Sequence, residues 1–119
     1  MAGIKQSLDE LMTMDGAMCA AVVDATSGMM LGAVGGGVDM EVAAAGNTEV
    51  VRSKLKTMRA LGLNDTIDDI LITLGKQYHI IRPCTNKEGA FVYYVLDKGR
   101  SNLALARRKA QDVDKVLQF

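Results

Sequence analysis

The chain has 119 residues, and its 14 Lys and Arg residues balance its 14 Asp and Glu residues, so the formal net charge is zero. This length predicts one domain over residues 1–119, and a chain without a basic excess is unlike a nucleic-acid binder. No apolar run reaches the roughly 18 residues that cross a bilayer, and the first ten residues lack the apolar core of a secretory signal. We therefore expect a cytoplasmic protein that inserts into no membrane.

The first half of the chain predicts a helix, a hairpin and a second, longer helix. Apolar residues at helical spacing predict a short amphipathic helix over residues 3–13. Residues 17–24 and 29–34 predict two buried strands that form a hairpin. A glycine link follows, and Asp39 is suited to cap a helix over residues 40–61.

The second half predicts three strands and a last helix. The strands are expected over residues 66–74, 77–84 and 90–97, with tight turns between them. A helix is expected to begin near Ser101. The predicted order α-β-β-α-β-β-β-α indicates an α/β (α+β) fold, in which helices cover both faces of a five-stranded, mostly antiparallel sheet.

The central helix carries an unusual run of small residues, Ala43 to Gly46. A glycine inside a helix costs about 1 kcal/mol relative to alanine, so the run is consistent with the close approach of a second helix. The same patch is equally consistent with a helix that lies flat on its own sheet. Asn47 falls within the apolar stripe of this helix, where it would meet its own copy at a two-fold crossing.

The opposite face of the central helix is charged. Its residues are Glu49, Arg52, Lys56 and Arg59. We interpret this face either as an ordinary solvated surface or as a site for a partner protein. The last helix carries Arg107-Arg108-Lys109, followed by Asp112 and Asp114, which predicts a solvated, partly self-paired face. Asp68 and Asp69 are interpreted as charges that protect a sheet edge.

The residue pattern favours no catalytic, metal or cofactor site. His79 lies in a predicted strand without a nearby carboxylate or cysteine at ligand spacing, and we expect it to be structural. Cys19 and Cys84 do not form a CxxC pair. The glycine-rich stretch of residues 32–37 lacks the Lys and Ser or Thr of a phosphate-binding loop. We therefore expect that the chain is not an enzyme.

Two segments together resemble a known family. The first contains Ile72-Thr73-Leu74-Gly75 followed by Tyr78-His79-Ile80-Ile81-Arg82-Pro83, and the second contains Asp97 followed by Asn102-Leu103-Ala104-Leu105-Ala106-Arg107. They are similar to the central hairpin and the C-terminal signature of the roadblock / dynein light chain superfamily. The resemblance extends over nearly the full chain, although the glycine link and the small-residue run are not part of the family's pattern.

The resemblance implies a roadblock-like or profilin-like three-layer sandwich that dimerises with itself or with a paralogue. It implies edge-to-edge pairing of the strand at residues 66–74, with the two central helices side by side on one face. The interface residues expected on this basis are Ala43, Ala44, Asn47, Val51, Thr66, Ile67, Asp68, Ile70 and Ile72.

The function that the resemblance implies is non-catalytic regulation or scaffolding of a small Ras-like GTPase, as an activator or an adaptor. The partner would contact Glu49, Arg52, Lys56 and Arg59. One alternative is a structural light chain of a larger assembly. Another is a small-molecule sensor, in which Met18, Met29 and Met30 would line a pocket.

Overall fold

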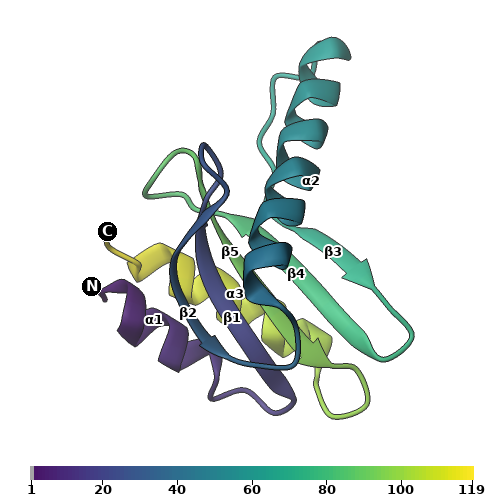
Figure 1. The fold of residues 1–119 in the computed structure, drawn as a ribbon. Coiled ribbons are helices and arrows are strands. Elements are labelled where there is room, and N and C mark those ends of the chain that lie inside the picture. Colours follow the sequence, from purple (N-terminus) through teal and green to yellow (C-terminus); the bar gives the residue numbers. More distant parts are fainter. Residues whose placement is uncertain (1) are drawn as a thin grey trace.

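A computed structural model describes residues 2–119 and contains the eight predicted elements in the predicted order (Figure 1). They are α1 (Ile4–Leu11), β1 (Ala17–Asp24), β2 (Met29–Gly35), α2 (Met40–Ala60), β3 (Ile70–Thr73), β4 (Gln77–Pro83), β5 (Ala90–Asp97) and α3 (Leu103–Val116). The strands form one sheet in the order β2-β1-β5-β4-β3, and every neighbouring pair is antiparallel. The predicted fold class is confirmed.

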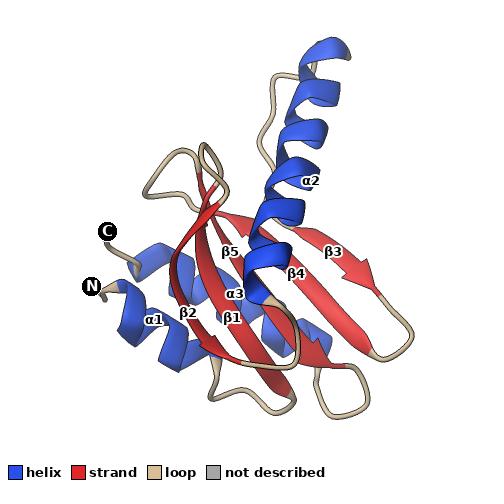
Figure 2. Cartoon of the chain, in the orientation of Figure 1, coloured by secondary structure: helices blue, strands red, loops and turns tan. Residues whose placement is uncertain are grey.

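The three layers follow from the two-residue alternation of side chains along the central strands. On one face Val22, Tyr94 and Leu96 pack against α1 and α3. On the other face, residues such as Tyr93 and Val95 pack under α2. Figure 2 shows α2 on one side of the sheet and α1 and α3 on the other. Because β1 and β5 are buried on both faces, their sequences are nearly continuous apolar runs.

Helix boundaries are set by side-chain caps and a glycine. The Asp39 carboxylate accepts a hydrogen bond from the Val42 backbone N–H at 3.2 Å, which confirms the predicted cap of α2. Asn102 caps α3 in the same way through the Leu105 N–H at 3.1 Å. Gly62 follows α2 with a φ of +70°, a conformation that costs glycine little.

The strand predicted over residues 66–74 was wrong in its extent, because only Ile70–Thr73 pair with β4. Two arginines hold the preceding residues away from the sheet ladder. Arg82 donates through Nη1 to the Asp68 carbonyl at 3.2 Å, and Arg107 binds both carboxylate oxygens of Asp69 at 2.8 and 2.9 Å. Asp69 therefore forms an ion pair with α3 and is not a free edge charge.

Three of the predicted interface residues consequently lie outside the strand. Thr66, Ile67 and Asp68 belong to a segment without regular secondary structure between α2 and β3. Ile70 and Ile72 lie in β3, at the edge of the sheet.

The interpretation of Asp114 as a solvated residue was also wrong, because its side chain is 0% exposed. Its carboxylate accepts hydrogen bonds from Arg82 Nε at 3.1 Å and from the Thr85 backbone N–H at 3.0 Å and hydroxyl at 3.1 Å. The Asn86 amide donates to carbonyls at the end of α3, including that of Leu117 at 3.2 Å. These contacts join α3 to β4 and to the β4–β5 turn.

No helix among residues 2–119 combines the length and the apolar character needed to cross a bilayer.

Candidate functional site

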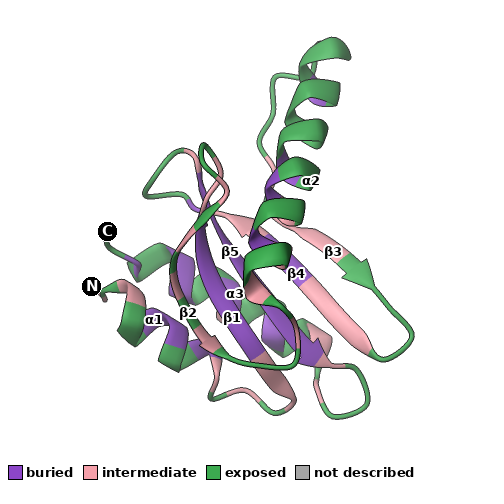
Figure 3. Cartoon of the chain, viewed as in Figure 1, coloured by how far each residue is buried: buried purple, intermediate pink, exposed green. Residues whose placement is uncertain are grey.

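The second half of α2 projects beyond the sheet (Figure 1). The first half packs on β1 and β2 through Ala44, Thr48 and Val51, which are buried. Beyond Val51, Met58 is the one buried residue of this helix, as the green upper half of the helix in Figure 3 shows. Leu55 and Leu61 of this half and its end are 37% and 65% exposed although they are large apolar side chains.

The two flanks of α2 face different parts of the molecule. Asn47 hydrogen-bonds the hydroxyl of Tyr93 on β5, and Arg52 donates to the Thr26 carbonyl in the β1–β2 turn at 2.5 Å. Helical spacing places Ala43 and Val50 on the same flank as Asn47. This flank faces the side of the sheet that carries β4 and β3.

The sequence left open whether the small residues from Ala43 to Gly46 contact the chain's own sheet or a second helix, and the structure answers differently for different residues of this run. Ala44 is buried on the chain's own sheet, whereas Ala45 and Gly46 are exposed. A Cβ added to Gly46 would meet no atom within 4 Å. Packing within the chain therefore accounts for Ala44 but does not require the glycine.

The α2-facing side of β3 and β4 is open. Ile81 of β4 packs with Tyr93 on this face. Ile70 and Ile72 lie on the same face, because they pair across the ladder with Ile81 and His79. Ile72 is 36% exposed although it is a large apolar side chain. An apolar half-sheet thus lies beside the Asn47 flank of α2.

A hydrogen-bonded chain of polar groups crosses this face. The Tyr93 hydroxyl lies 2.9 Å from His79 Nδ1, and His79 Nε2 lies 2.8 Å from Gln77 Oε1. A neutral imidazole satisfies both contacts, because Nδ1 accepts from Tyr93 and Nε2 donates to Gln77. Burial lowers the pKa of His79. Burial raises the pKa of Tyr93, and the hydrogen bond from Asn47 opposes part of this increase.

His79 predicts a pH-dependent stability. Its pKa is lowered in the folded state, so below the ordinary value of 6.5 the unfolded chain takes up a proton first. We expect the free energy of unfolding to be fully retained above about pH 6.5 and to decrease as the pH falls from there toward the folded pKa. Urea unfolding between about pH 7.5 and 5.5 measures this, because His79 is the chain's one histidine. An equal pH dependence in His79→Gln would contradict this assignment.

The four charged residues predicted to bind a partner are all exposed on α2, but their surroundings differ. Arg52 forms an ion pair with Glu49 at 3.2 Å in addition to its bond to Thr26, so it holds the β1–β2 turn. Lys56 and Arg59 form no ion pair within residues 2–119. Their charges are available to a partner.

The acidic and basic residues of α2 and its cap are separated along the helix. The acidic residues Asp39, Glu41 and Glu49 precede Val50, and the basic residues Arg52, Lys54, Lys56 and Arg59 follow it. The projecting half of the helix therefore carries only positive charge, although the whole chain is neutral.

The cysteines are poorly suited to thiolate chemistry. Burial raises the pKa of Cys19 to about 11 and that of Cys84 to about 12. Within the described part of the chain, no group of three or more His, Cys, Asp or Glu side chains could hold a metal ion. Met29 and Met30 line a shallow hollow beside Glu41 and Ala44, whereas Met18 packs against the core under α2 and takes no part in it.

Sequence reasoning missed the residues that act across long separations. Asp114 pairs with Arg82 and Asp69 pairs with Arg107, yet neither pair is close in sequence. The sequence contained one signal that Asp114 is buried. Asp114 follows Val113 directly and Ala110 by one helical turn, which places it at the border of the buried stripe of α3.

Comparisons with known proteins identify similar structures only. No family model matches the sequence, and no curated protein matches it. The structure of MglB from Myxococcus xanthus superposes with a TM-score of 0.81 at 16% identity, covering 94% of this chain and 89% of that one. A Roadblock/LC7 domain from Streptomyces avermitilis gives 0.81 at 11% identity, covering 96% and 93%. The gliding protein MglB from Thermus thermophilus gives 0.81 at 14% identity, covering 94% and 83%.

Proposed function

We propose that this chain, which has the roadblock fold of these structures, is a non-catalytic regulator or scaffold of a small Ras-like GTPase and works as a dimer with itself or with a paralogue. The observation that carries the proposal is the apolar half-sheet at Ile70 and Ile72 beside a helix whose second half has no sheet beneath it. Each feature exposes surface that a second roadblock domain would cover.

The charge distribution of α2 supports an antiparallel pairing of the two helices. In such a pair, Asp39 at the start of one helix would lie near Lys54 of the other, whereas Arg52, Lys56 and Arg59 stay on the opposite flank of α2. Opposite charges and opposite ends of the two helix dipoles are then adjacent. Parallel helices would instead place like charges together.

Gly46 supports the same pairing. Its cost of about 1 kcal/mol within a helix is not offset by any contact in the chain itself, because the space around it is empty. A second helix that crosses near Ala43 and Asn47 would use that space, since small residues permit a short distance between helix axes.

The GTPase would contact the projecting half of α2. Lys56 and Arg59 are the expected contacts, whereas Arg52 and Glu49 orient this surface through their ion pair and the bond to Thr26. The complementary surface of the partner would be acidic.

Charge reversal tests this surface. We expect Lys56→Glu/Arg59→Glu to raise the Kd for a candidate GTPase by roughly tenfold or more, because two attractive contacts become repulsive. Isothermal titration with the GTPase bound to a GTP analogue measures the Kd. The matched control is Lys98→Glu/Arg100→Glu, which makes the same charge change at an exposed turn outside α2.

An unchanged Kd in the double variant would reject the α2 surface.

The effect on GTP hydrolysis separates the two possible roles. A chain that binds the GTPase and changes its single-turnover GTP hydrolysis is a regulator. A chain that binds it without changing hydrolysis is a scaffold.

A further inference from the structure

The outer edge of β2 is unprotected. β2 lies at one end of the sheet, and its sequence, Met29-Met30-Leu31-Gly32-Ala33-Val34-Gly35, contains no charged residue and no proline. Met29 is 67% exposed and Leu31 is 43% exposed. Natural edge strands usually carry charges or prolines that prevent pairing with another chain, so this edge lacks the common protection.

Backbone groups at this edge are free to pair. Gly36 N donates to the Met18 carbonyl at 3.1 Å, and hydrogen-bonded pairs alternate along an antiparallel ladder. The next bonded pairs are therefore Val34 with Ala20 and Gly32 with Val22. The N–H and C=O of Ala33, which lies between them, point away from β1 toward the open edge.

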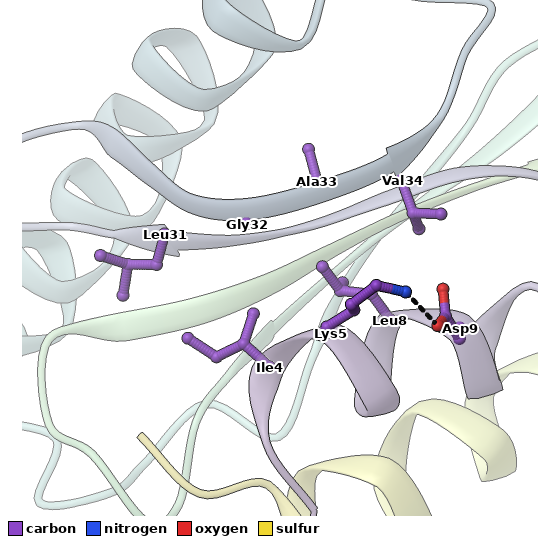
Figure 4. A pocket seen from close by; sticks show the side chains of 8 residues that line it. All are labelled: Ile4, Lys5, Leu8, Asp9, Leu31, Gly32, Ala33 and Val34. Atoms are coloured by element: carbon purple, nitrogen blue, oxygen red, sulfur yellow. Dashed lines mark hydrogen bonds and ion pairs between the residues drawn. The ribbon is translucent and has the colours of Figure 1, made fainter.

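Surface hollows flank β2 on both faces of the sheet. The hollow on the α1 side has a volume of about 370 Å³ and is lined by Ile4 and Leu8 of α1 together with residues 31–34 (Figure 4). The hollow on the α2 side has a volume of about 400 Å³ and is lined by residues 28–30, Glu41 and Ala44. Successive side chains of an added strand alternate between the two faces and would enter these hollows in turn.

We propose that the β2 edge binds an extended segment of a partner protein, which adds a strand to the sheet. The segment places apolar side chains toward α1 and basic side chains toward α2. This site is at the opposite edge of the sheet from β3, the edge proposed for the dimer.

The chemistry of the two hollows sets this preference. On the α1 side, Lys5 and Asp9 neutralise each other through an ion pair at 3.0 Å, which leaves Ile4 and Leu8 to select an apolar side chain. On the α2 side, Glu41 is exposed and forms no ion pair within residues 2–119. A lysine or arginine would pack its stem along apolar surface and bring its charge to this carboxylate.

A second copy of β2 does not meet these requirements. It carries no base to pair with Glu41. A different sequence, in which apolar residues alternate with lysine, satisfies both hollows at once. The occupant is therefore a segment of another protein.

Amide NMR titration of the full chain tests the proposal, with a short synthetic peptide in which valine alternates with lysine as the probe. We expect the amide signals of Ala33 and Gly35 to shift and their hydrogen exchange to slow. A matched peptide N-methylated at alternate residues cannot form the ladder, and we expect it not to bind. Shifts confined to β3, or equal binding of the methylated peptide, would overturn the proposal.

Glu41→Lys provides the matched reversal of charge. We expect it to weaken binding of the valine–lysine peptide by about fivefold and to strengthen binding of a valine–glutamate peptide to a similar degree. Ala33→Pro removes the outward N–H and should abolish binding of both peptides, with the fold checked by circular dichroism. Unchanged peptide preference in Glu41→Lys would contradict the site even if Ala33→Pro did not fold. Self-association through β2 without peptide would show that a second copy is the occupant and would also overturn it.

Discussion

Arg82→Ala should lower the free energy of unfolding by about 3–5 kcal/mol, because it leaves the buried Asp114 carboxylate without its counter-charge. Asp114 is 0% exposed and the Arg82 side chain is 11% exposed, so the pair is largely shielded from solvent. The Thr85 backbone and hydroxyl remain as donors, but neither carries a charge. The substitution also removes the bond to the Asp68 carbonyl, which positions the start of β3.

Urea unfolding measures this loss against a matched control. Arg108→Ala removes an ion pair with Asp112 in which both side chains are more than half exposed, and we expect it to cost at most about 0.5 kcal/mol. The double variant Arg82→Ala/Asp114→Ala should be more stable than the sum of the two single losses implies, because neither charge is then left unpaired. A loss in Arg82→Ala no larger than in the control would show that Asp114 does not depend on this partner.

Ile72→Asp should raise the dimer dissociation constant by about a hundredfold or more, if the open half-sheet is the dimer surface as proposed. Each copy would then place an unpaired carboxylate in an apolar contact, and a twofold interface contains the change twice. About 2.8 kcal/mol in total suffices for a hundredfold effect. The monomer should keep its fold, because Ile72 is 36% exposed and lies in the edge strand.

Sedimentation velocity over a concentration series measures the dissociation constant. Leu105→Asp is the control, since Leu105 is 57% exposed on α3 and lies on the opposite layer of the sandwich. It introduces the same charge away from the proposed interface. Equal effects of the two substitutions would place the interface elsewhere.

The order of elements was predictable because each element has a strong local pattern. β5 is a run of apolar and aromatic residues buried on both faces, and α3 repeats its apolar residues at helical spacing. The cap at Asp39 and the glycine at position 62 set the ends of α2. These features act within a few residues, so the sequence alone contains them.

The errors arose where distant residues override local preference. The segment before β3 has an apolar residue, Ile67, and a strand-like pattern, yet bonds from Arg82 and Arg107 hold it off the ladder. Asp114 has the composition of a solvated position but is buried by residues of β4 and the following turn. Neither contact follows from spacing along the chain.

The candidate site was predicted in part. His79 was expected to be structural, and its two hydrogen bonds are consistent with that role. Arg52 was grouped with Lys56 and Arg59 by helical spacing alone, but its contact with Thr26 separates it from them. The projection of α2 beyond the sheet could not be predicted, because it depends on where the strands end in space.

The mass of the purified chain in solution, measured by sedimentation equilibrium over a wide concentration range, tests the proposed dimer most directly. We expect a species of twice the 12.8 kDa chain mass that dissociates in Ile72→Asp. A wild-type chain that stays at 12.8 kDa at the highest concentration, alone and with its paralogues, would contradict the dimer.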